Sequence, residues 1–173
     1  MRALADRERI RRLMAAFGRE ARTNVRVYFV GGTTAVLMGW RDTTIDVDFA
    51  MRPEDDALLR AIPAMKESLQ INLELASPVD FIPVPAGWED RGTFIAQEGR
   101  VAFHHFDLYA QALAKVERGH EQDIADVRAM IERRLIEPHR ALEYFGRMEP
   151  DLYRFPAIDA TAFRRAAEDA FTP

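Results

Sequence analysis

The chain has 173 residues, of which 48% are hydrophobic and 30% are charged, and its net charge is -4. This composition excludes an intrinsically disordered chain, and the length suits one globular domain. No cysteine is present, which excludes disulfides, thiolate zinc sites and a cysteine nucleophile. The net charge excludes a nucleic-acid-binding surface over the whole chain but leaves a local basic patch open.

Neither a membrane segment nor a secretion signal is predicted from the sequence. No apolar run approaches the roughly 20 residues that cross a bilayer. The first eight residues, MRALADRE, become charged too early for a signal peptide. We therefore expect a cytoplasmic protein that makes no membrane contact.

The first half of the chain is predicted to alternate helices with strands. The apolar spacing between Ile10 and Phe17 predicts an amphipathic helix. Runs of β-branched, aromatic or alternating apolar residues predict strands at 25–30, 44–50 and 71–76. A short helix is expected at 33–38, and a longer helix begins at Pro53 and is interrupted at Pro63.

The second half is predicted to contain a loop, a hairpin and a run of helices. Three prolines within residues 77–92 indicate an irregular loop, and Glu98-Gly99 joins two short strands in a hairpin. Asp107 is expected to cap a helix that ends at Gly119. Further helices are predicted around 124–131, from Pro138 and from Asp159.

This order of elements predicts a single α+β domain over residues 1–173, with a mixed β-sheet flanked by helices. No internal repeat, low-complexity stretch or linker divides the chain. The core that carries the motifs is expected at about 25–131. Helices at about 138–173 would form a C-terminal extension.

Asp46 and Asp48 are the strongest candidates for a functional site. They lie two positions apart on a predicted strand, so both carboxylates leave one face while Val47 faces the core. Two neighbouring carboxylates repel each other unless a cation lies between them, and oxygen ligands of this kind suit Mg²⁺. For this pair alone, a half-exposed strand with two solvated acids is the alternative interpretation.

A Gly31-Gly32 turn ends the strand that precedes the aspartates. Glycine lets the backbone approach a ligand closely, and free N–H groups at a helix start attract phosphate. The two glycines, with Thr33 and Thr34, are therefore candidates to bind the phosphates of a nucleotide, which metal ions would bridge to the aspartates. A plain tight turn is the alternative.

Together, Val30-Gly31-Gly32, a spacer and Asp46-Val47-Asp48 resemble the signature of the nucleotidyltransferase superfamily. The segment 39–44, GWRDTT, is similar to a run of arginine and threonine in bacterial members, and Thr44 in it is a further nucleotide-binding candidate. The Gly-Gly form is more similar to abortive-infection toxins and small uncharacterised relatives than to Gly-Ser antitoxins. The resemblance implies an NTP substrate and two Mg²⁺ ions.

Lys115, Arg118, Asp123 and Asp126 extend the same resemblance. Toxin-like members carry a lysine on a helix and then a D-x-x-D element. Lys115 and Arg118 are one helical turn apart and could neutralise a triphosphate, and the two acids would hold these cations in place. A surface salt-bridge cluster of little energetic value is the alternative.

The resemblance also implies a third carboxylate on a neighbouring strand. Glu74 fits this position best, and Asp80 in the following loop is the other candidate. His104 and His105 are adjacent on a predicted strand, so their side chains leave opposite faces and do not form a metal site together. We expect one exposed and one packed histidine instead.

The expected activity is transfer of a nucleoside monophosphate from an NTP to an acceptor hydroxyl. Asp46, Asp48 and Glu74 would bind Mg²⁺, and Glu74 or Asp80 would accept the proton. Lys115 would balance charge that builds in the transition state. The resemblance implies tRNA or a protein as the acceptor, and a cognate antitoxin or toxin as a partner protein.

The alternative is a non-catalytic, nucleotidyltransferase-like module that binds a partner protein as one half of a toxin–antitoxin pair. Such a module keeps the fold but lacks a complete set of three carboxylates. The third carboxylate and Lys115 are therefore the features that separate the two hypotheses.

Overall fold

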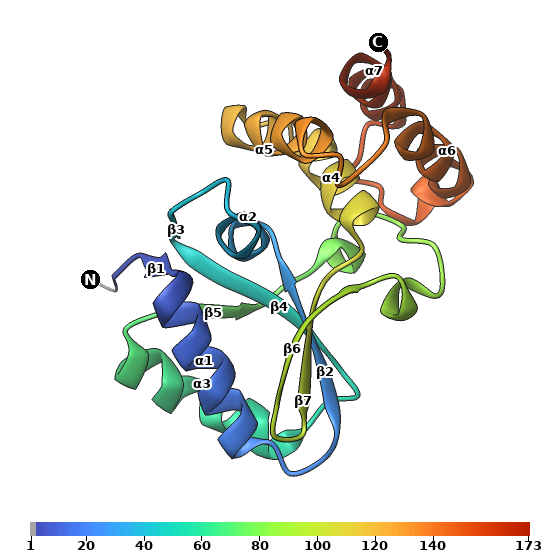
Figure 1. Cartoon of the computed structure of the whole chain (residues 1–173). Helices are drawn as coiled ribbons and strands as arrows, with labels where there is room; N and C mark the ends of the chain where they lie inside the picture. Colours follow the sequence, from blue (N-terminus) through green and yellow to red (C-terminus); the bar gives the residue numbers. More distant parts are fainter. Residues whose placement is uncertain (1–2) are drawn as a thin grey trace. The chain divides into compact units, whose positions relative to one another are not determined.

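The computed structural model describes residues 3–173, which form two compact units (Figure 1). The sheet unit consists of the chain up to Ser77 together with Arg91–Phe106. The helical unit consists of Pro78–Asp90 and Asp107–Pro173. No helix within residues 3–173 is long and apolar enough to cross a membrane.

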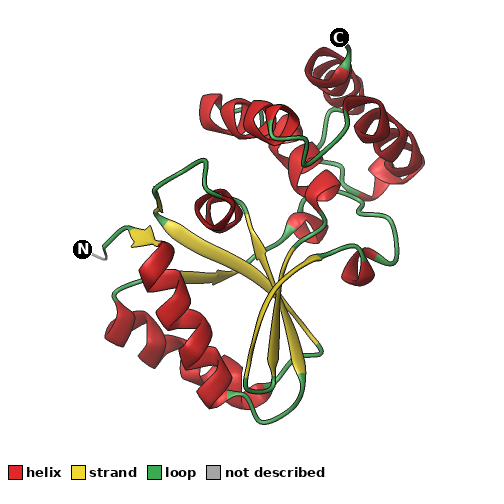
Figure 2. Ribbon diagram, in the orientation of Figure 1, coloured by secondary structure: helices red, strands yellow, loops and turns green. Residues whose placement is uncertain are grey.

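A five-stranded mixed sheet forms the centre of the sheet unit, with the strand order β5-β4-β2-β7-β6 (Figure 2). The strands are β2 (Val25–Val30), β4 (Asp46–Arg52), β5 (Asn72–Leu75), β6 (Thr93–Glu98) and β7 (Val101–His105). β2 runs antiparallel to β4 and parallel to β7, β4 runs parallel to β5, and β6 and β7 form an antiparallel hairpin. The predicted α+β class with a mixed sheet is confirmed.

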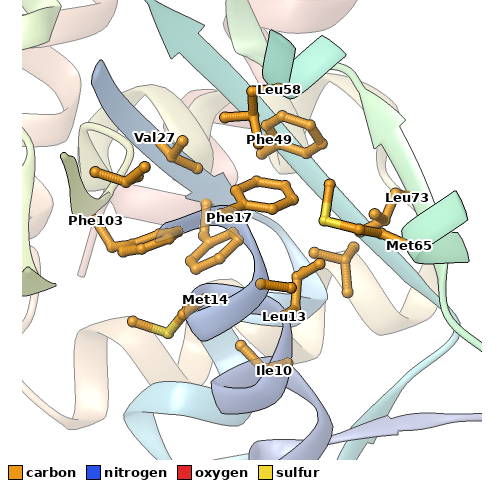
Figure 3. Close-up of a cluster of buried hydrophobic side chains, with 14 of the residues drawn as sticks. Ile10, Leu13, Met14, Phe17, Val27, Phe49, Leu58, Met65, Leu73 and Phe103 are labelled. Carbon is orange, nitrogen blue, oxygen red and sulfur yellow. The ribbon is translucent and has the colours of Figure 1, made fainter. Parts of the chain in front are cut away.

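Helices α1 (Arg7–Glu20) and α3 (Asp56–Leu69) pack on one face of this sheet. Their apolar side chains meet the inward-facing residues of the strands in one core (Figure 3). Phe17 of α1 lies edge-on against Phe49 of β4, with ring centroids 5.3 Å apart. Truncating a buried phenylalanine of this kind to alanine costs about 3–5 kcal/mol, so this core holds the sheet and the two helices together.

The short helix α2 (Gly32–Met38) follows β2 directly and contacts β4. It also contacts β3 (Thr43–Thr44), which pairs antiparallel with β1 (Ala5–Asp6). Only Ile45 separates β3 from β4, so α2, β3 and the start of β4 are neighbours. This arrangement brings the two sequence motifs of the sheet unit together.

The helical unit contains α4 (Leu108–Arg118), α5 (Glu121–Glu132), α6 (Pro138–Met148) and α7 (Ala160–Phe171). Three short 3₁₀ helices accompany them, namely η1 (Pro78–Asp80), η2 (Trp88–Asp90) and η3 (Glu149–Arg154). Asp107 begins α4 as predicted, because its carboxylate accepts the Tyr109 N–H at 3.0 Å, and its other oxygen accepts the Tyr144 hydroxyl at 2.9 Å. α4 ends at Gly119, whose φ is 71°.

The predicted interruption of the third helix at Pro63 is wrong. α3 runs through this residue without a break. Pro63 lies on the exposed side of the helix, so the carbonyl that loses its usual donor can be hydrated, while Leu58 and Met65 stay buried in the core. Packing of the buried face therefore outweighs the missing hydrogen bond.

Candidate functional site

β4 places Asp46 and Asp48 on the face of the sheet that is turned away from the α1–α3 core. Val47 and Phe49, which alternate with them, are fully buried in that core. Both aspartates are half-buried. Asp48 lies opposite Val30, the last residue of β2, in the antiparallel register. The acid pair is therefore next to the point where β2 ends and the glycine turn begins.

β5 brings two further polar side chains to the same face. In the parallel register Asn72 pairs with Asp46, and Glu74 pairs with Asp48. The Asn72 amide donates to the Asp46 carboxylate at 2.5 Å and to the Glu74 carboxylate at 3.1 Å. The sequence-based prediction missed Asn72, although its alternation with Glu74 on one strand was a signal that could have identified it.

Gly31 and Gly32 meet two different requirements of the turn. Gly31 has a φ of 61°, a conformation that residues with a side chain rarely adopt, and the space around its absent Cβ is open. A Cβ on Gly32 would lie 2.1 Å from Thr44 Oγ1, so no side chain fits there. The same Thr44 hydroxyl donates to the Asp46 carbonyl at 3.0 Å. Thr44 thus joins the glycine turn to the acid pair.

Arg41 brings positive charge to this turn. Its Nη1 atom lies 3.2 Å from the position that a Cβ on Gly32 would occupy. The segment 39–44 carried part of the family resemblance, but Arg41 was not predicted as a site residue. A guanidinium beside a glycine turn is suited to bind phosphate oxygens, because its planar fork can donate two hydrogen bonds at once.

The side chains of Thr33 and Thr34 are fully buried. The Thr34 hydroxyl lies 3.0 Å from His105 Nδ1, and it donates to the Phe29 carbonyl at 3.3 Å. These contacts hold α2 against β2 and β7. Any phosphate contact by the two threonines must therefore come from their backbone N–H groups.

Neither histidine of β7 is exposed, so the expectation of one exposed histidine is wrong. Burial lowers the pKa of His105 to about 4, with a smaller effect from His104. Burial also lowers the pKa of His104, and the charge of Arg26 acts in the same direction. The His104 ring stacks on Tyr28 and meets Phe94 edge-on, with centroid distances of 5.4 and 5.5 Å. Both histidines therefore serve packing.

The second predicted block forms a buried ion-pair cluster in the helical unit. Lys115 donates to Asp126 Oδ2 at 2.7 Å and lies 3.6 Å from Asp123 Oδ1. Arg118 contacts both carboxylate oxygens of Asp123, at 2.9 and 2.5 Å. Only 6% of the Lys115 side chain is exposed, compared with 58% for Arg118. This cluster is an interior feature, not a surface salt bridge.

The charges of this cluster balance one another. Two cations face two carboxylates, and Asp126 also accepts the Gln122 amide at 3.2 Å. Burial acts to raise the pKa of Asp123, but the hydrogen bond and charge of Arg118 and the charge of Lys115 outweigh it, and this pKa lies below its ordinary value. Lys115 is thus engaged by two carboxylates.

The acids of β4 and β5 offer a limited set of metal ligands. Within residues 3–173, no three His, Asp or Glu side chains lie close enough together to bind one metal ion. Mg²⁺ in proteins is commonly held by one or two carboxylates together with phosphate oxygens and water, so Asp46 and Asp48 fit this ion. Glu74 lies beside them on β5, whereas Asp80 lies in η1 of the helical unit.

Comparison with protein families gives a match over residues 8–137, which is 130 of the 173 residues. The matching family is described as nucleotidyltransferases of unknown function, DUF6036. The chain belongs to this family. No curated protein and no solved structure matches the chain.

The part of this nucleotidyltransferase that matches its family contains every candidate site residue. The glycine turn, Asp46, Asp48 and the Lys115 cluster all lie inside it, whereas α6 and α7 lie beyond it. The family description supports a transferase that uses an NTP, and it specifies no acceptor.

Proposed function

We propose that this nucleotidyltransferase is a cytoplasmic enzyme that transfers a nucleoside monophosphate from an NTP to an acceptor hydroxyl. One observation carries the proposal: Gly32 packs on Thr44, and Thr44 is hydrogen-bonded to Asp46, so a glycine turn and an acid pair lie side by side. Family membership supports the same reaction class. The proposal also includes a bacterial toxin–antitoxin role with a cognate protein partner. Only the resemblance described above supports this part.

Asp46 and Asp48 would hold the Mg²⁺ ions, of which the resemblance implies two. The two carboxylates leave one strand face, where their like charges repel each other until a cation binds. When bound, Mg²⁺ would neutralise phosphate charge and lower the pKa of the acceptor hydroxyl. Two carboxylates leave room in the coordination shell for the phosphates of the NTP.

Glu74 is better supported than Asp80 as the third acid, because it pairs with Asp48 in register and shares the Asn72 amide with Asp46. In the proposed step the acceptor oxygen bonds to the α-phosphorus. The bond from that phosphorus to the oxygen bridging the β-phosphate breaks, and pyrophosphate leaves. The proton of the acceptor hydroxyl passes to the Glu74 carboxylate.

The glycine turn would hold the phosphates that leave. Backbone N–H groups of Gly32, Thr33 and Thr34 would donate to phosphate oxygens, because the side chains of the threonines are buried. Arg41 lies beside this turn and is better supported than Lys115 as the cation that balances charge on the pyrophosphate. Lys115 and Arg118 would contribute only if their ion pairs with Asp123 and Asp126 opened.

A second candidate function is the non-catalytic module of a toxin–antitoxin pair. The observation that favours it is that, among residues 3–173, no group of three acids or histidines is ready to bind a metal ion. The engagement of Lys115 by Asp126 points the same way. Such a module would bind a partner protein and transfer no nucleotide.

Incubation with each α-phosphate-labelled NTP, Mg²⁺, and total tRNA or cell lysate distinguishes the two functions. We expect label to move to an acceptor with the wild type and not with Asp46→Asn/Asp48→Asn. Glu98→Gln is a control that removes an exposed acid from β6 and should transfer label normally. No transfer by the wild type to RNA or protein would favour the binding module.

A further inference from the structure

The short helix α2 is held at its C-terminal end by a residue of another helix. α2 spans seven residues, and isolated helices of this length are unstable in water. The Ala35 carbonyl accepts the Gly39 N–H at 2.9 Å, but Val36 and Leu37 follow in the last turn, whose carbonyls find no donor within a helix. Arg7 of α1 supplies that donor. Its Nη2 atom donates to the Val36 carbonyl at 3.2 Å and to the Leu37 carbonyl at 2.9 Å.

Arg7 is also the cation at this end of α2. A helix carries partial negative charge at its C-terminal end, and α2 has no basic residue in its own last turn. Arg7 and Val36 are 29 positions apart in the sequence, so their hydrogen bond is a tertiary contact. The guanidinium therefore stabilises the end of α2 that lies opposite the glycine turn and ties this helix to α1.

β1, directly before Arg7, holds the segment that follows α2. It pairs antiparallel with β3, and Ala5 lies opposite Thr44 (Figure 1). The segment 39–44 begins at the end of α2, which Arg7 binds, and it ends in β3, which β1 binds. Three consecutive residues, 5–7, therefore hold this segment at both ends.

The segment 39–44 carries two residues of the candidate nucleotide site. Arg41 Nη1 lies 3.2 Å from the position that a Cβ on Gly32 would occupy, and the Thr44 side chain packs against the same glycine. The Thr44 hydroxyl donates to the Asp46 carbonyl at 3.0 Å. A shift of this segment would therefore move the Arg41 guanidinium relative to the glycine turn and Thr44 relative to the acid pair.

We infer that Arg7 is a positioning residue of the nucleotide site, an inference that rests on the proposed function. Arg7 touches no reacting atom. By binding the last carbonyls of α2, it fixes where the segment 39–44 leaves this helix, and with it the place of Arg41 beside the glycine turn. The contribution of Arg7 to NTP binding therefore passes through Arg41. Arg7 lies just outside the family match over residues 8–137, and no sequence motif marked it.

Calorimetric titration of Mg²⁺–NTP into the wild type and Arg7→Met tests this inference, because methionine keeps an unbranched side chain but donates no hydrogen bond. We expect Arg7→Met to bind Mg²⁺–NTP about 10-fold more weakly, since two charge-assisted hydrogen bonds that hold α2 are lost. Arg7→Lys keeps the positive charge and its donors, so it should retain part of the affinity that Arg7→Met loses.

Arg9→Met is the matched control. Arg9 also lies on α1, and it donates to the carbonyl of Leu69, the last residue of α3, at 2.9 Å. α3 carries no candidate site residue, and the strand after it, β5, is held by its pairing with β4. Arg9→Met should therefore lower the free energy of unfolding, as Arg7→Met does, but leave the affinity for Mg²⁺–NTP close to that of the wild type.

A double-mutant cycle with Arg41→Ala tests whether Arg7 acts through Arg41. In the Arg41→Ala background, Arg7→Met should cost clearly less NTP affinity than it does in the wild type, because the residue that it positions is already gone. A loss of the same size in both backgrounds would overturn the inference. Equal losses of NTP affinity in Arg7→Met and Arg9→Met would do the same, because they would reflect general destabilisation.

The outcome for Arg7 can be separated from the outcome for the reaction. If the wild type binds Mg²⁺–NTP and transfers label, and folded Arg7→Met does both equally well, the inference about Arg7 fails and the transferase proposal stands. If the wild type binds no Mg²⁺–NTP, the proposed nucleotide site is wrong, and the inference about Arg7 fails with it.

Discussion

The side-chain amide of Asn72 on β5 donates to the carboxylate of Asp46 on β4 across a distance of 2.5 Å. The same amide reaches the Glu74 carboxylate at 3.1 Å. One neutral donor therefore orients two acids on adjacent strands whose charges repel each other. Asn72 contacts no reacting atom in the proposed step, so we regard it as a positioning residue.

Asn72→Ala should weaken Mg²⁺-dependent NTP binding by about 10-fold, because hydrogen bonds to charged groups contribute about 1.5–3 kcal/mol and both acids lose theirs. The free energy of unfolding should change by less than about 1 kcal/mol, since the site is only half-buried. Calorimetric titration with NTP and Mg²⁺ measures the first quantity, and urea unfolding measures the second. Unchanged NTP affinity in a folded variant would show that Asn72 does not position the acids.

The core of the candidate site was predictable from the sequence because its signals are local. Strand alternation placed Asp46 and Asp48 on one face, and the glycine pair marked the turn before them. Asn72 and Arg41 were missed because their roles depend on contacts that no local pattern encodes: a parallel strand register, and the packing of α2 against β3.

The burial of predicted residues was harder to foresee than their location. Lys115 and Asp126 were expected to share a cluster, and they do, but their spacing gave no sign that the cluster lies in the protein interior. Pro63 indicated an interruption of the helix, yet tertiary packing of α3 overrides that local preference. Local patterns predicted which residues meet, whereas the surrounding packing decides how they are solvated.

Gly31→Ala and Gly32→Ala are a matched pair that separates backbone strain from steric exclusion. Gly31→Ala should cost about 1 kcal/mol, because its φ of 61° is strained for alanine while the space around it is open. Gly32→Ala should cost more and also impair NTP binding, because the new Cβ would displace Thr44 and through it Asp46. Urea unfolding and NTP titration measure the two effects. Similar losses in both variants would contradict this distinction.

Lys115→Ala should destabilise the fold by about 3–5 kcal/mol, because Asp126 is fully buried and would lose its cation. Arg118→Ala is the control: its guanidinium is 58% exposed, so its removal should cost clearly less. Lys115→Ala/Asp126→Ala should recover part of the loss, since no unpaired charge remains. Equal unfolding free energies for Lys115→Ala and the wild type would contradict the structural importance of this ion pair.

The same variant also tests the catalytic role proposed for Lys115. If its ammonium stabilises the transition state, Lys115→Ala should slow nucleotide transfer by about 10²–10³-fold, with a smaller change in NTP affinity. The rates are compared at a temperature at which the variant is folded. If Arg41 has this role instead, Arg41→Ala should produce that loss and folded Lys115→Ala should not. Single-turnover rates beside NTP affinities separate these outcomes.

His105 should make the fold sensitive to mild acid. Its pKa is about 4 in the folded chain, below the ordinary value of 6.5, because burial disfavours the charged ring. The unfolded chain therefore binds more protons between pH 6.5 and 4. The contribution of His105 to the free energy of unfolding is therefore fully present above pH 6.5. The free energy of unfolding should fall by up to about 3 kcal/mol as the pH drops toward 4.

His105→Asn should flatten this pH dependence, because the asparagine amide can still donate to the Thr34 hydroxyl oxygen but does not titrate. The part contributed by His104, whose pKa is also lowered by burial, should remain. Asp55 titrates outside this window, because four hydrogen bonds lower its pKa against the opposing effect of burial. Urea unfolding at several pH values measures the difference, and parallel curves for wild type and variant would contradict the assignment.

The central claim is that Asp46 and Asp48 form the Mg²⁺ and NTP site, and calorimetric titration of Mg²⁺–NTP into wild type and Asp46→Asn/Asp48→Asn tests it most directly. The variant should fold and melt at the same or a higher temperature, because two repelling charges are removed. We predict that the wild type binds NTP only with Mg²⁺ and that the double variant loses this Mg²⁺-dependent binding, while Glu98→Gln keeps it. Equal Mg²⁺-dependent affinity in the wild type and the folded double variant would contradict the claim.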